Sequence, residues 1–167
     1  GFATVKGASP KKNTDNITIV ASTDFYAEIA QTVVGNHGKA TAIIKSANVS
    51  PEDYEPTTTV AKKVSGADIA LANGLGYDSW LNKLAKTSQK TQLIRIGENV
   101  LNEKAGINPH LWNNTDTMTK TAQYLADTLS KKDPTHKKDY QANAKKYIAS
   151  LKPVTALIND LKKDAHN

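Results

Sequence analysis

The chain has 167 residues, of which 38% are hydrophobic and 23% charged, and this composition is typical of a single globular domain. No apolar run approaches the ~20 residues that a membrane-spanning helix requires, and the absence of Cys excludes disulfides, thiolate metal sites and cysteine nucleophiles. The formal charge of +6 is concentrated in residues 131–167, where we expect a solvated, lysine-rich helix face and not a nucleic-acid site, because aromatic residues make up only 6% of the chain and Arg95 is its single arginine.

Short apolar runs and amphipathic stretches alternate along most of the chain. Residues 1–16 precede them and are small, polar and basic, which predicts a flexible N-terminal tether. The apolar runs predict four strands that begin 24, 27 and 24 residues apart: 17–21, 41–45, 68–73 and 92–96. Amphipathic helices are predicted between the strands at 24–34, 57–66 and 77–87. We therefore expect an α/β fold with a four-stranded parallel sheet and helices on both of its faces.

Two longer amphipathic helices are predicted after the fourth strand, at 114–132 and 136–164. Pro153 lies inside the second helix and is expected to kink it near Ala149. The apolar stripe of this helix continues into the last residues, and no Gly follows it as a terminator. The predicted division is therefore an α/β unit, residues 17–135, followed by a long helix, residues 136–167, whose unfinished apolar stripe indicates a chain that has been cut short.

Two polar segments are candidates for a functional site: NVSPEDYEP at residues 48–56 and NPHLW at residues 108–112. Ligands of parallel α/β sheets bind beyond the carboxyl ends of the strands, and both segments are expected at that end. The first segment carries three carboxylates: Glu52, Asp53 and Glu55. One of them and the imidazole of His110 could form a partial metal site or an acid/base pair. The residues alone also allow a structural His110 and carboxylates that are only solvated or helix-capping.

Other motifs point to ordinary structural roles. The Gly74-Leu75-Gly76 turn lacks the following Lys of a phosphate-binding loop and the third Gly of a dinucleotide fingerprint, so a tight turn at a strand end is expected. No GxSxG motif is present, which leaves a serine hydrolase triad without its nucleophile elbow. His37 and His136 are expected at the surface, away from any site.

Four motifs occur in an order that belongs to one family: IVASTDFYAEIAQTVVG, NVSPEDYEPTTTVAKKVSGADIALANGLGYDSWLNKL, INPHLW and DYQANAKKYIASL. Over residues 17–164 the chain resembles the metal-binding solute-binding lipoproteins of bacterial ABC importers, which bind zinc or manganese and are also described as adhesin-like lipoproteins. The resemblance implies two α/β lobes joined by a long rigid helix, with the metal ion held between the lobes. It identifies this chain with the N-terminal lobe, residues 17–135, and the linking helix, residues 136–167, truncated before a second lobe.

The resemblance also implies ligands. His110, in NPHLW, matches a metal ligand of the family. A segment that usually reads PHDYEP reads PEDYEP here, so Glu52 occupies the position of the first histidine ligand, while Asp53, Tyr54 and Glu55 are expected to be structural. A carboxylate favours harder ions than an imidazole does, and GENVLNEKAGIN contains no His where many zinc-specific members have a His-rich loop. Both departures favour manganese.

The function that the resemblance implies is that of an extracytoplasmic, lipid-anchored receptor, which is a binding protein and not an enzyme. It would bind Mn²⁺ or Zn²⁺ as a transported ligand, use no organic cofactor, and deliver the ion to the permease of an ABC transporter. Two alternatives stay open. The chain could be an adhesin-like interaction module whose metal site has degraded, since Glu52 replaces a histidine. It could also be a small α/β enzyme that uses His110 and Glu52 as an acid/base pair.

Overall fold

The computed structural model describes residues 16–104, 106–112 and 114–165. Four parallel strands form one sheet in the order β2-β1-β3-β4: β1 (Ile17–Thr23), β2 (Gly38–Ile44), β3 (Ile69–Ala72) and β4 (Gln92–Arg95). The helices are α1 (Asp24–Val34), α2 (Thr58–Ser65), α3 (Ser79–Lys86), α4 (Thr115–Lys132), α5 (Lys137–Ser150) and α6 (Lys152–Ala165). Short helical turns complete the chain: η3 (Gly35–His37), η4 (Pro51–Asp53), η5 (Ile96–Val100), which is a π-helix, and η6 (Pro134–His136). The predicted α/β class and parallel four-stranded sheet are confirmed.

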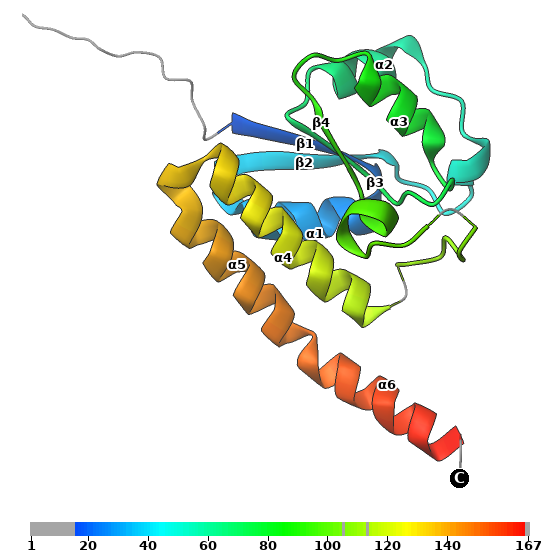
Figure 1. Cartoon of the computed structure of the whole chain (residues 1–167), viewed down its shortest axis with the longest axis vertical. Helices are drawn as coiled ribbons and strands as arrows, with labels where there is room; N and C mark the ends of the chain where they lie inside the picture. Colours follow the sequence, from blue (N-terminus) through cyan, green and yellow to red (C-terminus); the bar gives the residue numbers. More distant parts are fainter. Residues whose placement is uncertain (1–15, 105, 113, 166–167) are drawn as a thin grey trace, which may run out of the picture.

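Helices cover both faces of the sheet (Figure 1), with α2 and α3 on one face and α1, α4 and α5 on the other. The two central strands are buried on both faces, because successive side chains of a strand point in opposite directions. In β1, Ile19 and Ala21 pack into the core beneath α1, α4 and α5, whereas Val20 packs beneath α2 and α3. Burial on both faces explains why these strands appear in the sequence as continuous apolar runs. A strand buried on only one face would show alternating apolar and polar residues.

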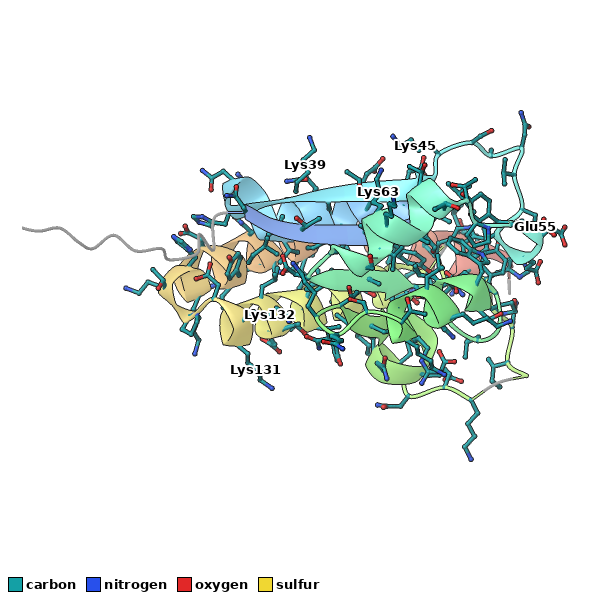
Figure 2. All side chains as sticks on the ribbon, turned by 90° about the horizontal axis from the view of Figure 1, so that it is seen from above. Lys39, Lys45, Glu55, Lys63, Lys131 and Lys132 are labelled. Atoms are coloured by element: carbon teal, nitrogen blue, oxygen red, sulfur yellow. The ribbon has the colours of Figure 1, made fainter. Side chains whose placement is uncertain are left out.

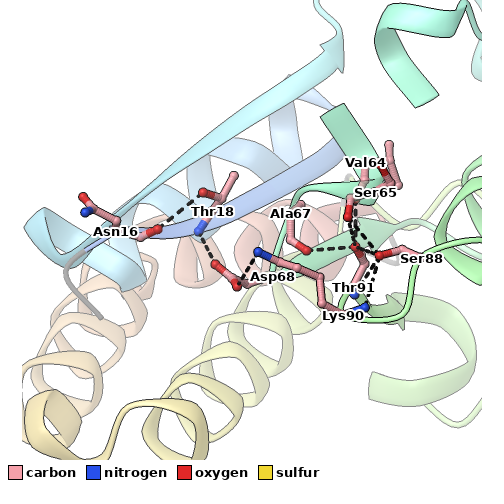
Figure 3. A network of polar contacts seen from close by, with 9 residues as sticks. All are labelled: Asn16, Thr18, Val64, Ser65, Ala67, Asp68, Ser88, Lys90 and Thr91. Atoms are coloured by element: carbon pink, nitrogen blue, oxygen red, sulfur yellow. Dashed lines mark hydrogen bonds and ion pairs between the residues drawn. The ribbon is translucent and has the colours of Figure 1, made fainter. Parts of the chain in front are cut away.

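The amino end of the sheet is closed by a fixed polar network (Figure 3). The carboxylate of Asp68, just before β3, accepts a hydrogen bond of 2.8 Å from the backbone N–H of Thr18 in β1. The hydroxyl of Thr91, just before β4, lies 2.8 Å from the carbonyl oxygens of Val64 and Ala67. These bonds satisfy backbone groups near the starts of β1 and β3 and at the end of α2.

The long C-terminal helix is present, but it is interrupted. A single 136–164 helix with a kink near Ala149 was expected; the chain instead forms α5 and α6, with a turn at Leu151 between them. The cause is Pro153, which has no N–H to donate and whose ring crowds the carbonyl of Ala149. Tyr140 and Ala144 of α5 are buried in the core, whereas α6 buries no residue and extends away from the sheet (Figure 1).

Two further predictions concern the ends and the charge of the chain. The predicted tether falls almost wholly on residues 1–15, which lie outside the described residues. All nine lysines between Lys131 and Lys163 are exposed, so the predicted solvated, lysine-rich face is confirmed. Across the described ranges, no helix has the length and apolar character needed to cross a membrane.

The interruption at Leu151 should disappear when its cause is removed. In Pro153→Ala a backbone N–H becomes available for the carbonyl of Ala149, so α5 and α6 are expected to join into one helix. Amide hydrogen exchange at residues 150–154 should slow, while the free energy of unfolding changes by no more than about 0.5 kcal/mol because α6 buries nothing. Unchanged exchange at Leu151 would show that the break has a different cause.

Candidate metal-binding site

The buried side chain of Asn73 connects three segments at the carboxyl end of the sheet. Asn73 directly follows β3 and is fully buried. Its Oδ1 accepts a short hydrogen bond from the hydroxyl of Tyr26 in α1, and its Nδ2 donates to the carbonyl oxygen of Pro109 at 2.7 Å. The loop that carries His110 is thereby attached to the ends of β1 and β3. Segments 22–26, 73–80 and 97–112 meet at this end of the sheet, as the parallel topology predicted.

The fourth predicted segment, NVSPEDYEP, is attached to the same end through Trp80. The indole Nε1 of Trp80 donates a hydrogen bond of 2.8 Å to the carbonyl oxygen of Pro51, and the ring of Tyr54 packs on the indole with centroids 4.7 Å apart. Tyr54 therefore has a packing role. In Figure 2, Glu55 lies at one end of the molecule, whereas Lys131 and Lys132, in the last turn of α4, lie towards the other end.

A tight turn joins β3 to α3 and is held by Asp78. The carboxylate of Asp78 accepts hydrogen bonds from the backbone N–H of Asn73 at 2.7 Å and of Gly74 at 3.0 Å. Gly74, Leu75 and Gly76 all have positive φ values, of 82°, 56° and 81°, and a Cβ on Gly74 would lie only 2.1 Å from an oxygen of Glu98. The positive φ values explain the two glycines, as expected for a tight turn at the end of a strand.

Burial raises the pKa of Asp78 above its ordinary value, and the two backbone N–H donors offset part of that rise. The same burial raises the pKa of Tyr26, with a smaller contribution from the negative charge of Asp78. These groups form a polar layer beneath the surface, between the core and the exposed side chains. Tyr26, Asn73 and Asp78 were not singled out from the sequence. The signal for two of them was a polar residue at each end of the turn that follows a buried strand: Asn73 and Asp78 in LANGLGYD.

His110 is exposed on the loop before α4, and its ring packs against two aromatic side chains that also contact each other, with centroids 5.0 Å apart. Its imidazole contacts Tyr77 and Trp112 edge to face, at centroid distances of 5.8 Å and 5.0 Å. Ring atom Nδ1 lies 2.7 Å from Oδ1 of Asn108, an atom that also accepts from the backbone N–H of His110 at 3.0 Å. Within the described part of the chain the other ring nitrogen, Nε2, makes no hydrogen bond.

Glu52 is exposed in η4 and lies near the same tyrosine. Burial is the main reason that the pKa of Tyr77 is raised, and the negative charges of Glu52 and then Asp78 raise it further. The charge of the Glu52 carboxylate thus acts on the hydroxyl of Tyr77, and the ring of Tyr77 contacts the ring of His110. Two residues that are far apart in the sequence, His110 and Glu52, therefore both lie near Tyr77.

This arrangement offers one imidazole nitrogen and one carboxylate to a metal ion. Asp53 and Glu55 are exposed on the same segment. In the ranges that the structure describes, no group of three or more His, Cys, Asp or Glu side chains could hold a metal ion. Two such side chains could fill only part of a coordination shell, since zinc takes about four ligands and manganese sites are commonly octahedral.

The other histidines lie elsewhere. His37 was expected at the surface, but its side chain is only 13% exposed: Nε2 lies 2.7 Å from Oδ2 of Asp139, and the ring stacks on His136 with centroids 3.7 Å apart. This prediction was wrong because a polar turn after a helix carries no signal of the α5 residues that later cover it. His37 directly precedes β2 and so belongs to the amino end of the sheet, away from His110.

Comparison with known proteins places the chain in a family. Residues 19–166 match the family described as zinc-uptake complex component A, periplasmic, and the chain belongs to that family. It is 27% identical over 150 residues to the manganese-binding lipoprotein MntA of Halalkalibacterium halodurans, covering 87% of this chain and 50% of that protein. It is 31% identical over 161 residues to the manganese ABC transporter substrate-binding lipoprotein PsaA of Streptococcus pneumoniae, covering 86% of this chain and 52% of that protein.

A solved structure shows the same fold. The Mn-bound periplasmic metal binding protein from Candidatus Liberibacter asiaticus matches with a TM-score of 0.73 at 21% identity, covering 87% of this chain and 58% of that one. The chain spans about half the length of the relatives it matches. The predicted resemblance to the importer lipoproteins is thereby confirmed.

The raised pKa of Asp78 predicts a pH dependence of stability. Between about pH 4, the ordinary value for Asp, and its raised value in the folded protein, the folded state binds more protons than the unfolded chain. The free energy of unfolding of the wild type should therefore fall, relative to that of Asp78→Asn, as pH rises through this window. Urea unfolding of both proteins from about pH 4 to about pH 7 measures the difference. A difference that stays constant or grows with pH would contradict the prediction.

Proposed function

We propose that this chain captures a divalent transition-metal ion, Mn²⁺ or Zn²⁺, outside the cytoplasm for delivery to an ABC importer. The observation that carries the proposal is that the ring of His110 contacts Tyr77, while the negative charge of Glu52 raises the pKa of the same tyrosine. Two relatives are named for manganese and the family for zinc uptake. The ion is the transported ligand, and no organic cofactor is required.

The two side chains have complementary roles in this proposal. A neutral imidazole donates a lone pair from Nε2, and a carboxylate contributes oxygen and negative charge. Because intrinsic affinity favours Zn²⁺ over Mn²⁺ at most nitrogen and oxygen sites, replacing an imidazole by a carboxylate reduces that advantage. Glu52, at the position of a family histidine, therefore supports manganese.

The rest of the coordination shell is proposed to come from a second lobe. Among the described residues, the large apolar side chains that are most exposed lie on the two site loops and on α6: Val49, Ile107, Val154, Leu157 and Leu161. Leu157 and Leu161 are 60% and 59% exposed although α6 is amphipathic. Apolar side chains that are this exposed are typical of a surface that another part of a protein covers. We propose that the second lobe covers them and that α6 links it to the lobe of residues 17–135.

The proposed role breaks no bond in the ligand, so the chain acts as a binding protein and not as an enzyme. The permease of an ABC transporter is the proposed partner, and attachment to the membrane through a lipid anchor is proposed because both named relatives are lipoproteins. The adhesin-like alternative with a degraded metal site gains no support, since those relatives are named for the metal they bind or transport.

Loss of the imidazole tests the proposal most simply. Calorimetric titration of the metal-stripped chain with Mn²⁺ and Zn²⁺ should show binding that weakens on the order of 100-fold or more in His110→Ala, because even partners of metal ligands contribute about 10–100-fold. Equal affinity in wild type and variant would reject His110 as a ligand.

The carboxylate has a matched control on the same segment. Glu52→Gln should weaken Mn²⁺ binding by about tenfold or more, whereas Glu55→Gln, which removes an exposed carboxylate three positions along, should leave the affinity unchanged. Glu52→His should shift the preference from Mn²⁺ towards Zn²⁺. If both glutamine variants bind Mn²⁺ alike, Glu52 is not a ligand.

A further inference from the structure

One oxygen atom fixes the chemical form of the His110 ring. Oδ1 of Asn108 lies 3.0 Å from the backbone nitrogen of His110, whose N–H can only donate, so the atom at this position is an acceptor and hence the amide oxygen. The same oxygen lies 2.7 Å from ring atom Nδ1. Nδ1 must therefore carry the ring hydrogen and donate it, because two acceptors at this distance would repel each other. The lone pair of the neutral ring is then on Nε2.

We propose that Asn108 is a positioning residue for metal capture: it holds His110 in the Nδ1–H form and directs the Nε2 lone pair outward. This inference rests on the proposed function and adds to it a residue that contacts no ion itself. Metal-binding histidines usually donate their second ring N–H to a carbonyl or carboxylate group, which fixes the tautomer and the ring orientation. Asn108 supplies that acceptor from within the same loop, two residues before the ligand.

The surroundings of the loop make this contact effective. The carbonyl of Pro109, between the two residues, accepts a hydrogen bond of 2.7 Å from the buried amide of Asn73, so the backbone is fixed to the sheet. Tyr77 and Trp112, which also contact each other, pack against the imidazole. An exposed histidine would otherwise sample several rotamers and both tautomers, and ordering it on binding would cost free energy.

A purely structural role for Asn108 makes a different prediction. An Asn side chain that accepts from the N–H two residues later is a common turn device. If Asn108 does only this, its removal loosens the turn but leaves the ring hydrogen where it was. The position of that hydrogen is therefore the deciding quantity, and it can be measured without any metal.

The experiment is a long-range ¹H–¹⁵N correlation of the histidine rings in the metal-free, 167-residue chain, at a pH where the imidazoles are neutral. The His110 signals, assigned by their loss in His110→Ala, should show the Nδ1–H form in the wild type. In Asn108→Ala they should move towards the Nε2–H form, and in Asn108→Asp, which keeps the acceptor, they should not. An Nε2–H ring in the wild type, or an unchanged ring in Asn108→Ala, would overturn the proposal.

A Zn²⁺ titration of the same variants connects the ring to binding. Asn108→Ala should bind about 10–100-fold more weakly than the wild type; Asn108→Asp should keep the affinity, as should the control Asn159→Ala, which removes an exposed amide on α6. Equal affinity in Asn108→Ala and the wild type would overturn the positioning role. Failure of the metal site itself is recognised separately, because His110→Ala would then bind as the wild type does whatever the ring spectrum shows.

Discussion

The site depends on one buried side-chain amide. Asn73 has no access to solvent, yet its oxygen accepts from Tyr26 and its nitrogen donates to Pro109, so α1, the end of β3 and the loop before α4 are connected through a single group. A buried amide whose bonds are satisfied stabilises only one arrangement of its partners, since losing a partner leaves a polar atom unpaired at a cost of about 1–3 kcal/mol. The position of His110 relative to the sheet follows from this constraint.

The polar groups at the two ends of the sheet have different roles. At the amino end, Asp68 and Thr91 bond to backbone groups and simply close the structure. At the carboxyl end, a buried polar layer supports exposed groups that are not used by the fold: the Nε2 atom of His110 and the carboxylate of Glu52. Rigid support beneath the proposed ligands favours binding because little remains to be ordered when an ion arrives.

Repeated, periodic features of the sequence predicted the fold well. The helix predicted at 24–34 has the observed bounds of α1, and all four strands overlap their predicted apolar runs, although β2 begins three residues earlier than the predicted 41–45. Burial on both faces of a parallel sheet leaves a strong local signal. The convergence of NVSPEDYEP and NPHLW also followed from topology alone. No periodic signal exists for a single amide such as Asn73, whose partners lie 47 and 36 residues away.

Other features were missed for the same reason. The break at Leu151 was placed two residues early, since the position at which a proline interrupts a helix depends on local packing and not on spacing. The burial of His37 depends on Asp139, 102 residues later. The contact between Asn108 and His110 is local, and an Asn two residues before a histidine could have suggested it. Only the structure shows that one oxygen of Asn108 accepts from both the backbone N–H and the ring of His110.

The most direct test of this account is the position of a bound ion. A crystal of the chain soaked in Mn²⁺ should give an anomalous-diffraction peak within coordination distance of Nε2 of His110 and a carboxylate oxygen of Glu52, at about 2.0–2.3 Å. A peak there, with Nδ1 still bonded to Asn108, is the predicted result. A peak elsewhere on the molecule while His110 and Glu52 stay free of metal would contradict the central claim.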